Sequence, residues 1–233
     1  MEPALPLPQV AVAITGESIV VTAQDDSTEA ARAGSATVFT VRGGVVVSEQ
    51  RLVPMPASVD ASYGFAVAAY EDVIMVGAPR TKSILWGDNV TAGEVFVYER
   101  RGDTWQETQV LKAKPSRARD AFGSSVAISA RGALIGVVGD SSEARGVGAD
   151  ASLPSADYAG AAYLYARDAE GWKQSAYLKA ANADGDDMFG MGVALSDEVA
   201  IVSALFEGSN ATSINGNVDN NSLPTSGAIY VFE

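Results

Sequence analysis

The 233-residue sequence predicts an all-β fold, a β-propeller of about four four-stranded blades that forms part of a larger propeller. Three observations support this. An aromatic-glycine phrase recurs in fixed phase, each copy contains short alternating or β-branched runs, and no segment shows the 3.6-residue apolar period of a helix. Four short strands per repeat of this size are typical of a propeller blade rather than of a β-sandwich. We therefore interpret residues 1–233 as a single propeller segment, with repeats at about 9–57, 58–116, 117–183 and 184–233.

Three landmarks define the repeat. The first is an aromatic-glycine pair followed by Val-Ala, the second is a small-residue entry into an alternating run, and the third is a leucine that closes the next run. The pairs are Tyr63-Gly64, Phe122-Gly123 and Phe189-Gly190; the entries begin at Gly34, Gly93, Gly160 and Gly227; the leucines are Leu52, Leu111 and Leu178. The step from entry glycine to leucine is 18 residues each time, and from leucine to the next aromatic it is 11, so the copies keep a common phase.

Each copy is predicted to contain four short strands, with the last one missing from the fourth copy. In the second copy they cover residues 65–69, 73–78, 94–99 and 104–111, separated by Gly, Asp and Asn turns. The runs at 19–21 and 73–76 are apolar throughout, which predicts strands buried on both faces of a sheet. Short polar turns, such as Glu71-Asp72 and Asp197-Glu198, join the first strand of a copy to the second.

The connection between the second and third strands varies in length. It spans 11 residues from Ala23 to Gly34 and 23 residues from Ala204 to Gly227, and the longer copies are rich in Asn, Asp, Ser and Gly. Loops tolerate insertion and carry function, whereas scaffold segments keep their length. We therefore predict a recognition rim built by residues 24–33, 80–92, 140–159 and 205–226.

The two ends of the repeat array differ from its middle. The first copy has Pro8-Gln9 in place of the aromatic-glycine pair, and the fourth copy stops at Glu233 before its fourth strand. A closed four-blade ring would need residues 5–8 to supply the missing edge, so we favour a segment of a longer propeller. Unpaired strand edges otherwise invite pairing with another chain.

Composition narrows the possible partners and chemistries. Sixteen basic against 29 acidic residues give a net charge of −13, which disfavours nucleic acid and anionic membranes and favours cations or basic ligands. The absence of Cys and His excludes disulfides, thiolate sites, imidazole bases, Ser-His-Asp triads and His-ligated zinc. No apolar run is long enough to insert into a membrane, and the first eight residues do not resemble a secretion signal. If the protein is exported, we expect its signal to lie outside this numbering.

The repeated phrase resembles the FG-GAP repeat, the unit of integrin α-subunit propellers, and most of all its relatives in secreted or surface proteins of bacteria and unicellular eukaryotes. The resemblance rests on Phe189-Gly190 with Val193-Ala194, on the run from Gly227 to Phe232, and on Trp172 with Leu178. Only the second copy keeps the Gly77-Ala78-Pro79 phrase intact. The resemblance implies a propeller, an extracellular or cell-surface location, and adhesion or ligand-binding work.

One departure from the family pattern concerns metal. Integrin-type repeats often carry a calcium loop between the first two strands, but here that connection is a short turn such as Asp197-Glu198. The nearest calcium-like stretch, Asn182-Ala183-Asp184-Gly185-Asp186-Asp187, lies between two copies and has fewer alternating carboxylates than an all-protein calcium site requires. We interpret it as a solvated turn and predict no metal site and no cofactor.

Three other motifs bear on function. Arg101-Gly102-Asp103 spells the tripeptide that integrins recognise, but Gly and Asp are ordinary turn residues, and a hairpin turn is expected there. Trp105 and Trp172 hold a fixed place in the repeat, which indicates packing between blades rather than stacking on a sugar. Asn89, Asn210 and Asn220 begin N-glycosylation sequons in variable loops. They are glycan acceptors if a eukaryote secretes the protein, and Asn-rich loop residues otherwise.

These observations favour a non-catalytic function. No spacing pairs two carboxylates for acid–base work, no phosphate loop precedes a helix, and we predict no catalytic residues. The predicted function is an extracellular or surface interaction and adhesion module that binds a protein or glycan ligand through its variable loops. The alternative is a structural subunit of an extracellular filament or envelope that self-assembles through open blade edges.

Overall fold

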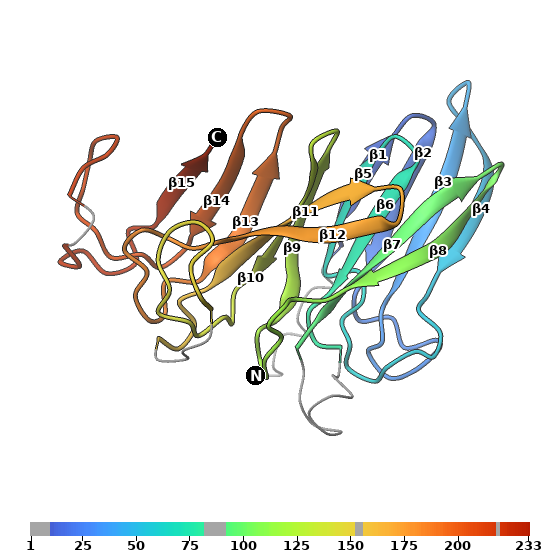
Figure 1. Ribbon diagram of the computed structural model, residues 1–233. Coiled ribbons are helices and arrows are strands. Elements are labelled where there is room, and N and C mark those ends of the chain that lie inside the picture. Colours follow the sequence, from blue (N-terminus) through green and yellow to red (C-terminus); the bar gives the residue numbers. More distant parts are fainter. Residues whose placement is uncertain (1–9, 82–91, 152–155, 218–219) are drawn as a thin grey trace, which may run out of the picture.

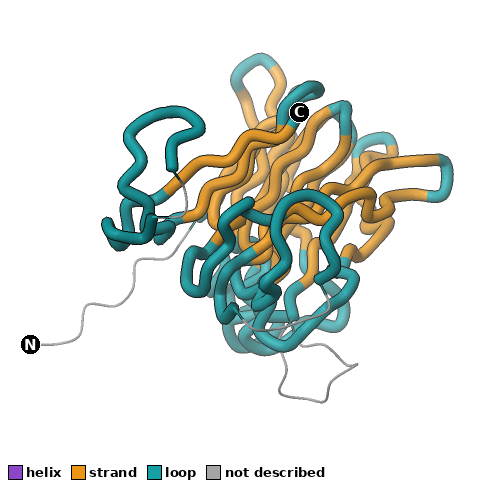
Figure 2. Tube along the Cα trace, turned by 60° about the vertical axis from the view of Figure 1, so that its left-hand side comes forward, coloured by secondary structure: helices purple, strands orange, loops and turns teal. Residues whose placement is uncertain are grey.

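The computed structural model describes residues 10–81, 92–151, 156–217 and 220–233. The described chain contains fifteen β-strands and no helix, which confirms the all-β prediction (Figures 1 and 2). The strands form four antiparallel sheets, and within each sheet the strand order follows the sequence. Short β-branched runs joined by polar turns have thus folded as up-and-down blades.

Three blades have four strands and the last has three. The first contains β1 (Val12–Thr15), β2 (Ser18–Ala23), β3 (Ser35–Arg42) and β4 (Val45–Leu52); the second contains β5 (Ala66–Tyr70), β6 (Val73–Ala78), β7 (Glu94–Arg101) and β8 (Thr104–Leu111); the third contains β9 (Phe122–Ser129), β10 (Gly132–Val137), β11 (Ala161–Asp168) and β12 (Gly171–Leu178); the fourth contains β13 (Phe189–Leu195), β14 (Ala200–Ala204) and β15 (Ala228–Phe232). The predicted bounds match β6 and β8, whereas β5 lies one residue later than predicted and β7 continues to Arg101.

The blades stack in chain order through their first strands. β1 contacts β5, β5 contacts β9, and β9 contacts β13. Figure 1 shows the first blade at one end of this array and the fourth blade at the other. The four sheets therefore have the arrangement of consecutive β-propeller blades.

A separate hydrophobic cluster lies at each of the three junctions between consecutive blades. Val20 and Val38 of the first blade pack with Ile74 and Trp105 of the second. The corresponding clusters at the next two junctions are centred on Phe122 with Tyr163, and on Phe189 with Val202. The predicted packing of Trp105 is therefore observed, and Trp172 is buried in the same way.

The aromatic-glycine phrase joins each blade to the one before it. The backbone N–H of Phe122 donates to the carbonyl of Ala92 at 2.9 Å, and Phe122 pairs with Gly93 in an isolated parallel bridge. Tyr63 and Phe189 pair with the preceding entry glycines in the same way. A Cβ added at Gly93 would lie 2.2 Å from the Phe122 carbonyl oxygen, so this position excludes any side chain.

A glutamine clasp joins the outermost strands of neighbouring blades. Gln50 of β4 donates from Nε2 to the Trp105 carbonyl at 2.7 Å, and its Oε1 accepts from the Trp105 N–H at 2.8 Å. Gln109 of β8 makes the same two contacts with Trp172. The backbone of each tryptophan is thereby fixed while its ring is buried between the blades.

The first blade differs from the prediction of strands buried on both faces. The prediction is confirmed for β6, whose residues are all buried, but in β2 the side chains of Ile19 and Val21 are only half-buried. No described segment covers the face of the first blade on which they lie. Residues 5–8, considered above as a closing edge, fall outside the described residues.

Candidate ligand-binding rim

Figure 1 places the connectors between blades and the loops between second and third strands on one side of the array, opposite the hairpin turns. We call this side the connector rim. Of the loops predicted to form it, residues 24–33 are described throughout, and the other three contain segments outside the described residues. In Figure 2 most of these loops gather below the strands, whereas the loop between β14 and β15 rises beside them. The longest ones belong to the third and fourth blades.

In each blade, one polar residue anchors the loop that follows the second strand. The anchor is the third residue after the strand ends: Asp26, Thr81, Asp140 and Glu207. In each blade the anchor's backbone carbonyl accepts the N–H of the entry glycine, at 2.9 Å for Asp140 with Gly160. The loop between an anchor and its glycine can therefore change in length while its base stays constant.

The anchor of the third blade belongs to a buried ion pair. Lys179 Nζ lies 3.2 Å from Asp140 Oδ1, and the two side chains are 0% and 2% exposed. The Tyr177 hydroxyl and the Ser142 N–H also donate to Asp140 Oδ1, at 2.9 and 3.0 Å. Burial lowers the pKa of Lys179, and the neighbouring Asp140 carboxylate opposes that shift. This cluster stabilises the base of the loop.

The anchor of the fourth blade is a buried Glu207. Its Oε1 accepts from Asn182 Nδ2 at 3.0 Å, and its Oε2 accepts from the Ser209 N–H at 3.0 Å. The Tyr230 hydroxyl donates to Asn182 Oδ1 at 2.6 Å. Ser226 then closes the loop, because its hydroxyl lies 2.6 Å from the Ser209 carbonyl. The base of the 205–226 loop is thus held on both sides.

Two carboxyls of the connectors have raised pKa values. Burial raises the pKa of Asp120 to about 7, and it raises the pKa of Asp187 to about 6. Each accepts a local backbone N–H: that of Arg117 at 2.5 Å for Asp120, and that of Asp184 at 3.0 Å for Asp187. Asp120 is 2% exposed, which is why desolvation dominates the shift of its pKa.

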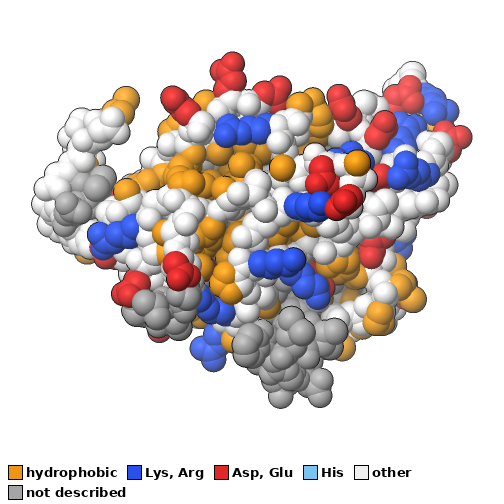
Figure 3. All heavy atoms as spheres, viewed as in Figure 1, with side chains coloured by type: hydrophobic (Ala, Val, Ile, Leu, Met, Phe, Trp, Pro, Cys, Tyr) orange, Lys and Arg blue, Asp and Glu red, His pale blue; other side chains and the backbone are white. Residues whose placement is uncertain are grey.

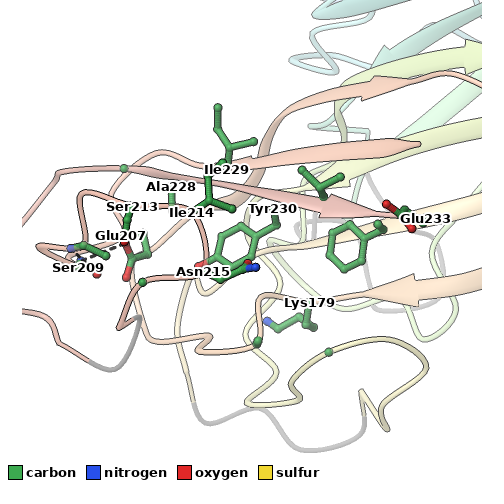
Figure 4. Close-up of a pocket in the computed structure, with 17 residues that line it drawn as sticks. Lys179, Glu207, Ser209, Ser213, Ile214, Asn215, Ala228, Ile229, Tyr230 and Glu233 are labelled. Atoms are coloured by element: carbon green, nitrogen blue, oxygen red, sulfur yellow. Dashed lines mark hydrogen bonds between the residues drawn. The ribbon is translucent and has the colours of Figure 1, made fainter. Parts of the chain in front are cut away.

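A groove of about 830 Å³ lies between β15 and the 205–226 loop. Its walls include Ser209 and Asn215 from the loop, Lys179 from the preceding connector, and Tyr230 from the strand. Figure 4 shows Tyr230 extending from β15 toward the side of Lys179, with Ile229 on the opposite side. In Figure 3 the loop stands away from the body, with hydrophobic side chains exposed over the strands next to it. The groove runs along the open edge of β15.

A second hollow on the connector rim is polar and largely acidic. It has a volume of about 420 Å³, and its charged lining residues are Glu143, Arg145, Asp157, Asp184 and Asp186. Arg145 lies 3.6 Å from Asp184, whose other carboxylate oxygen accepts from Asn221 Nδ2 at 2.6 Å. Four carboxylates against one guanidinium give this hollow a negative potential that favours a basic ligand group.

Residues 182–187 form the connector for which the sequence predicts a solvated turn. The prediction is right only for Gly185 and Asp186, which are exposed, because Asn182, Ala183 and Asp187 are buried. The carboxylates of this connector diverge, since Asp184 faces Arg145 and Asn221, whereas Asp187 is buried against the backbone. Among the described residues, no group of three or more His, Cys, Asp and Glu side chains could hold a metal ion. The described part of the chain likewise contains no helix long and apolar enough to cross a membrane.

The Arg101-Gly102-Asp103 tripeptide forms the turn between β7 and β8, on the hairpin side of the array. Gly102 has a positive φ of 65°, as a tight hairpin turn requires. Arg101 pairs with Glu99 at 2.6 Å, and Asp103 lies 3.7 Å from Arg42 of the first blade. The tripeptide thus has structural contacts within the array.

The asparagines of the three sequons differ in how far the structure describes and exposes them. Asn89 falls outside the described residues. Asn210 is exposed in the long loop of the fourth blade, whereas Asn220 is half-buried, and its Oδ1 accepts from the Ser222 N–H at 2.8 Å. Asn210 is therefore the described sequon with the more accessible side chain.

Several important residues were missed by reasoning from the sequence. Gln50 and Gln109 both lie 16 residues after an entry glycine, and this shared position was the signal that could have found the clasp. Asp26, Asp140 and Glu207 share a position in the same way. Their partners lie at different places: Asp26 binds Ser35 and Arg51 of its own blade, whereas Asp140 and Glu207 bind Lys179 and Asn182 of the connector between the third and fourth blades. No spacing rule identifies them.

Comparison with known families follows the same repeat. The FG-GAP repeat pattern matches residues 105–165 and 172–232, just over half of the chain. Each match begins at the clasped tryptophan of one blade and ends in the third strand of the next, so it spans the junction between blades. No curated protein matches the chain significantly. The matched repeats and the four blade-like sheets show that the chain belongs to the FG-GAP repeat family.

Proposed function

We propose that this chain is a non-catalytic interaction and adhesion module of an extracellular or cell-surface protein. Its ligand is a protein or glycan bound by the connector rim of the third and fourth blades. FG-GAP repeats support a propeller-like interaction module, and the finer assignment depends on the rim. The observation that carries it is the long 205–226 loop, which is anchored at its base and stands over a groove of about 830 Å³.

The blades and the loops use different residues, and this difference supports the proposal. The repeated aromatics, entry glycines and clasp glutamines are used in the contacts that join blades, so they are not available to a ligand. The rim loops vary in length, expose polar side chains, and keep a constant base through their anchors. Variable loops on a rigid scaffold are the usual location of binding sites.

The ligand is expected to present basic groups. The chain carries a net charge of −13, and the 420 Å³ hollow beside the groove is lined by Glu143, Asp157, Asp184 and Asp186 with a single arginine. Electrostatic complementarity of this kind raises association rates and selects against acidic partners. It also supports the expectation that nucleic acid is not a partner.

A loop replacement tests the proposal. Residues 210–225 are replaced by a short Gly-Ser turn, which leaves the anchor Glu207, the closing Ser226 and the entry Gly227 in place. The labelled wild-type chain is applied to a printed glycan array and to a panel of intact cells, and the variant is applied under the same conditions. The variant should lose binding and keep the thermal midpoint of the wild type. Unchanged binding would refute the assignment to this rim.

A structural role in an extracellular filament or envelope is the alternative, because β15 pairs only with β14 among the described strands. An open edge of this kind can pair with a strand of another chain. Size measured in solution would decide against this role if the chain stayed monomeric at every concentration.

A further inference from the structure

A groove of about 430 Å³ lies on the outer flank of the array, between the fourth strands of the second and third blades. One wall comes from β8 and the residues that follow it, and the other comes from β12 and Tyr165 of β11. Figure 1 shows β8 and β12 side by side. Both blades have all four strands, so both walls of the groove are present. Its volume is in the usual range for small-ligand sites.

The charged side chains that line this groove are all lysines. They are Lys112 and Lys114 on one wall and Lys173 on the other, and none of the described carboxylates lines the groove. Lys112 and Lys173 pair at 2.6 and 2.9 Å with Glu94 and Asp168, which lie outside the lining. Lys114 is exposed and has no ion pair among the described residues. In Figure 3, Lys and Arg side chains gather over this part of β8 and β12.

The lysines are specific to this junction and are not part of the repeat. At the junction between the first and second blades, Val53, Met55 and Gln106 occupy the three equivalent positions. The hollow there is smaller, about 260 Å³, and its charged lining residues are Glu49 and Asp103. Both hollows lie beside a clasped tryptophan, so the scaffold does not require lysines at these positions.

Trp172 gives a second, independent indication of a ligand. Its side chain lines the groove and is 5% exposed. The ring packs at the junction between blades, but its indole N–H has no acceptor within the described part of the chain. A buried donor without a partner is unfavourable, so an acceptor that enters from the groove would be bound favourably.

The main chain beside the groove is already hydrogen-bonded. Gln109 binds the N–H and the carbonyl of Trp172 at 2.8 and 2.7 Å, and Gln174 binds those of Lys114 at 3.0 Å each. A peptide that added a strand here would need these main-chain groups. The donors left for a ligand are ammonium and indole groups of side chains, which suit a compact anion better than an extended peptide.

We propose that this groove binds an acidic sugar, whose sulfate or carboxylate group lies among the three lysines and accepts from the Trp172 indole N–H. Ammonium groups form strong charge-assisted hydrogen bonds with such oxyanions. The groove is larger than a single sulfate and is lined mainly by polar side chains, so the acidic group has to be carried by a larger polar body. The site is separate from the connector rim and does not rest on the function proposed for that rim.

Titration calorimetry at low salt tests the charge of the ligand. The probes are a sulfated carrageenan disaccharide, digalacturonic acid, which carries only carboxylates, and maltose, which is neutral. The wild type should bind at least one acidic probe and not maltose, and the probe that binds identifies the acidic group. Lys114→Glu should weaken this binding by about tenfold or more. Arg80→Glu is the matched control, because it makes the same charge change at an exposed position outside the groove.

A pair of tryptophan variants tests the indole contact. Trp172→Phe keeps an aromatic ring at the junction and removes the N–H, so it should weaken binding of the acidic sugar. Trp105→Phe makes the same change at the junction between the first and second blades and should leave binding unchanged. The thermal midpoint establishes that each variant is folded. The variant in which residues 210–225 are replaced should also keep this binding, so failure of this proposal is distinguishable from failure of the rim.

Several results would overturn the proposal. They are no binding of either acidic probe, equal weakening by Lys114→Glu and Arg80→Glu, or equal effects of the two tryptophan variants. Inorganic sulfate that binds as tightly as the sulfated disaccharide would indicate an adventitious ion only. A hexaglutamate peptide that binds more tightly than both acidic sugars, and that loses binding in Lys114→Glu, would show that the ligand is an acidic peptide and not a sugar.

Discussion

Lys179 shows how a buried charge on the connector rim is compensated by its neighbours. Its ammonium group lies 3.2 Å from Asp140, which also accepts from Tyr177 and Ser142. Removing one partner of such a pair leaves the other charge buried and uncompensated. The pair therefore fixes the register between the third blade and the connector that follows it.

Lys179→Met should lower the free energy of unfolding by about 3–5 kcal/mol, because Asp140 would remain buried without its cation. Denaturant unfolding measures the change. Adding Asp140→Asn to this variant should recover most of the loss. Lys173→Met is the control, since Lys173 pairs with Asp168 on the exposed surface and should matter little. Equal effects of Lys179→Met and Lys173→Met would contradict the account of the buried pair.

Asp120 predicts a dependence of stability on pH. Its pKa is raised from 3.8 to about 7 in the folded chain, so the folded state holds this proton more tightly than the unfolded state does. The stabilisation is present below the unfolded pKa and is lost as the pH rises toward 7, by up to about 4 kcal/mol.

An Asp120→Asn variant should lack this part of the pH dependence, and its unfolding free energy should exceed that of the wild type by a growing margin as the pH rises. Asp187, whose pKa is raised to about 6, contributes with the same sign in both proteins and cancels in the difference. Parallel stability curves for the two proteins between pH 4 and 8 would show that Asp120 does not titrate in this range.

At the scale of elements, the junction between blades depends on close backbone contact. Gly160→Ala should destabilise the fold by about 3 kcal/mol or more, because the added Cβ would lie 2.1 Å from the Phe189 carbonyl oxygen. Gly148→Ala separates this clash from backbone strain, since Gly148 also has a positive φ but has no atom within 4 Å of the added Cβ. The Gly148→Ala variant should lose only about 1–2 kcal/mol in free energy of unfolding. Thermal unfolding compares the two variants. Equal losses of stability in Gly160→Ala and Gly148→Ala would argue against close backbone contact at the junction.

The glutamine clasp links the outermost strands. Gln109→Ala removes both hydrogen bonds to the Trp172 backbone and should cost about 1–2 kcal/mol in the free energy of unfolding. Gln106→Ala, at an exposed position of the same strand, should leave stability within about 0.5 kcal/mol of the wild type. A clasp variant as stable as the Gln106 control would mean that the paired bonds add nothing beyond solvent contacts.

For the whole molecule, the sequence predicted what depends on local pattern and repeat phase. The bounds of β6 and β8, the buried tryptophans and the short hairpin turns follow from alternation, turn residues and constant spacing. The half-buried Ile19 and Val21 could not be distinguished from fully buried residues, because their exposure depends on whether another blade covers them.

The contacts of the rim were less predictable. Lys179 meets Asp140 across 39 residues, and Glu207 meets Asn182 across 25, through loops that differ in length between blades. The clasp was hidden because the third copy has Ala176 where Gln50 and Gln109 stand in the first two. The repeat therefore indicates where the scaffold lies, and the rim that the scaffold carries has to be found in three dimensions.

The central claim is that the connector rim binds the ligand and the hairpin side does not. Two variants with the same change in net charge test it most directly: Glu143→Lys with Asp157→Lys on the connector rim, and Asp197→Lys with Glu198→Lys in a hairpin turn. Binding of each labelled chain to intact cells is compared at equal folding, checked by the thermal midpoint. The account predicts that only the rim variant loses binding. Equal loss by both variants, or loss by the hairpin variant alone, would contradict it.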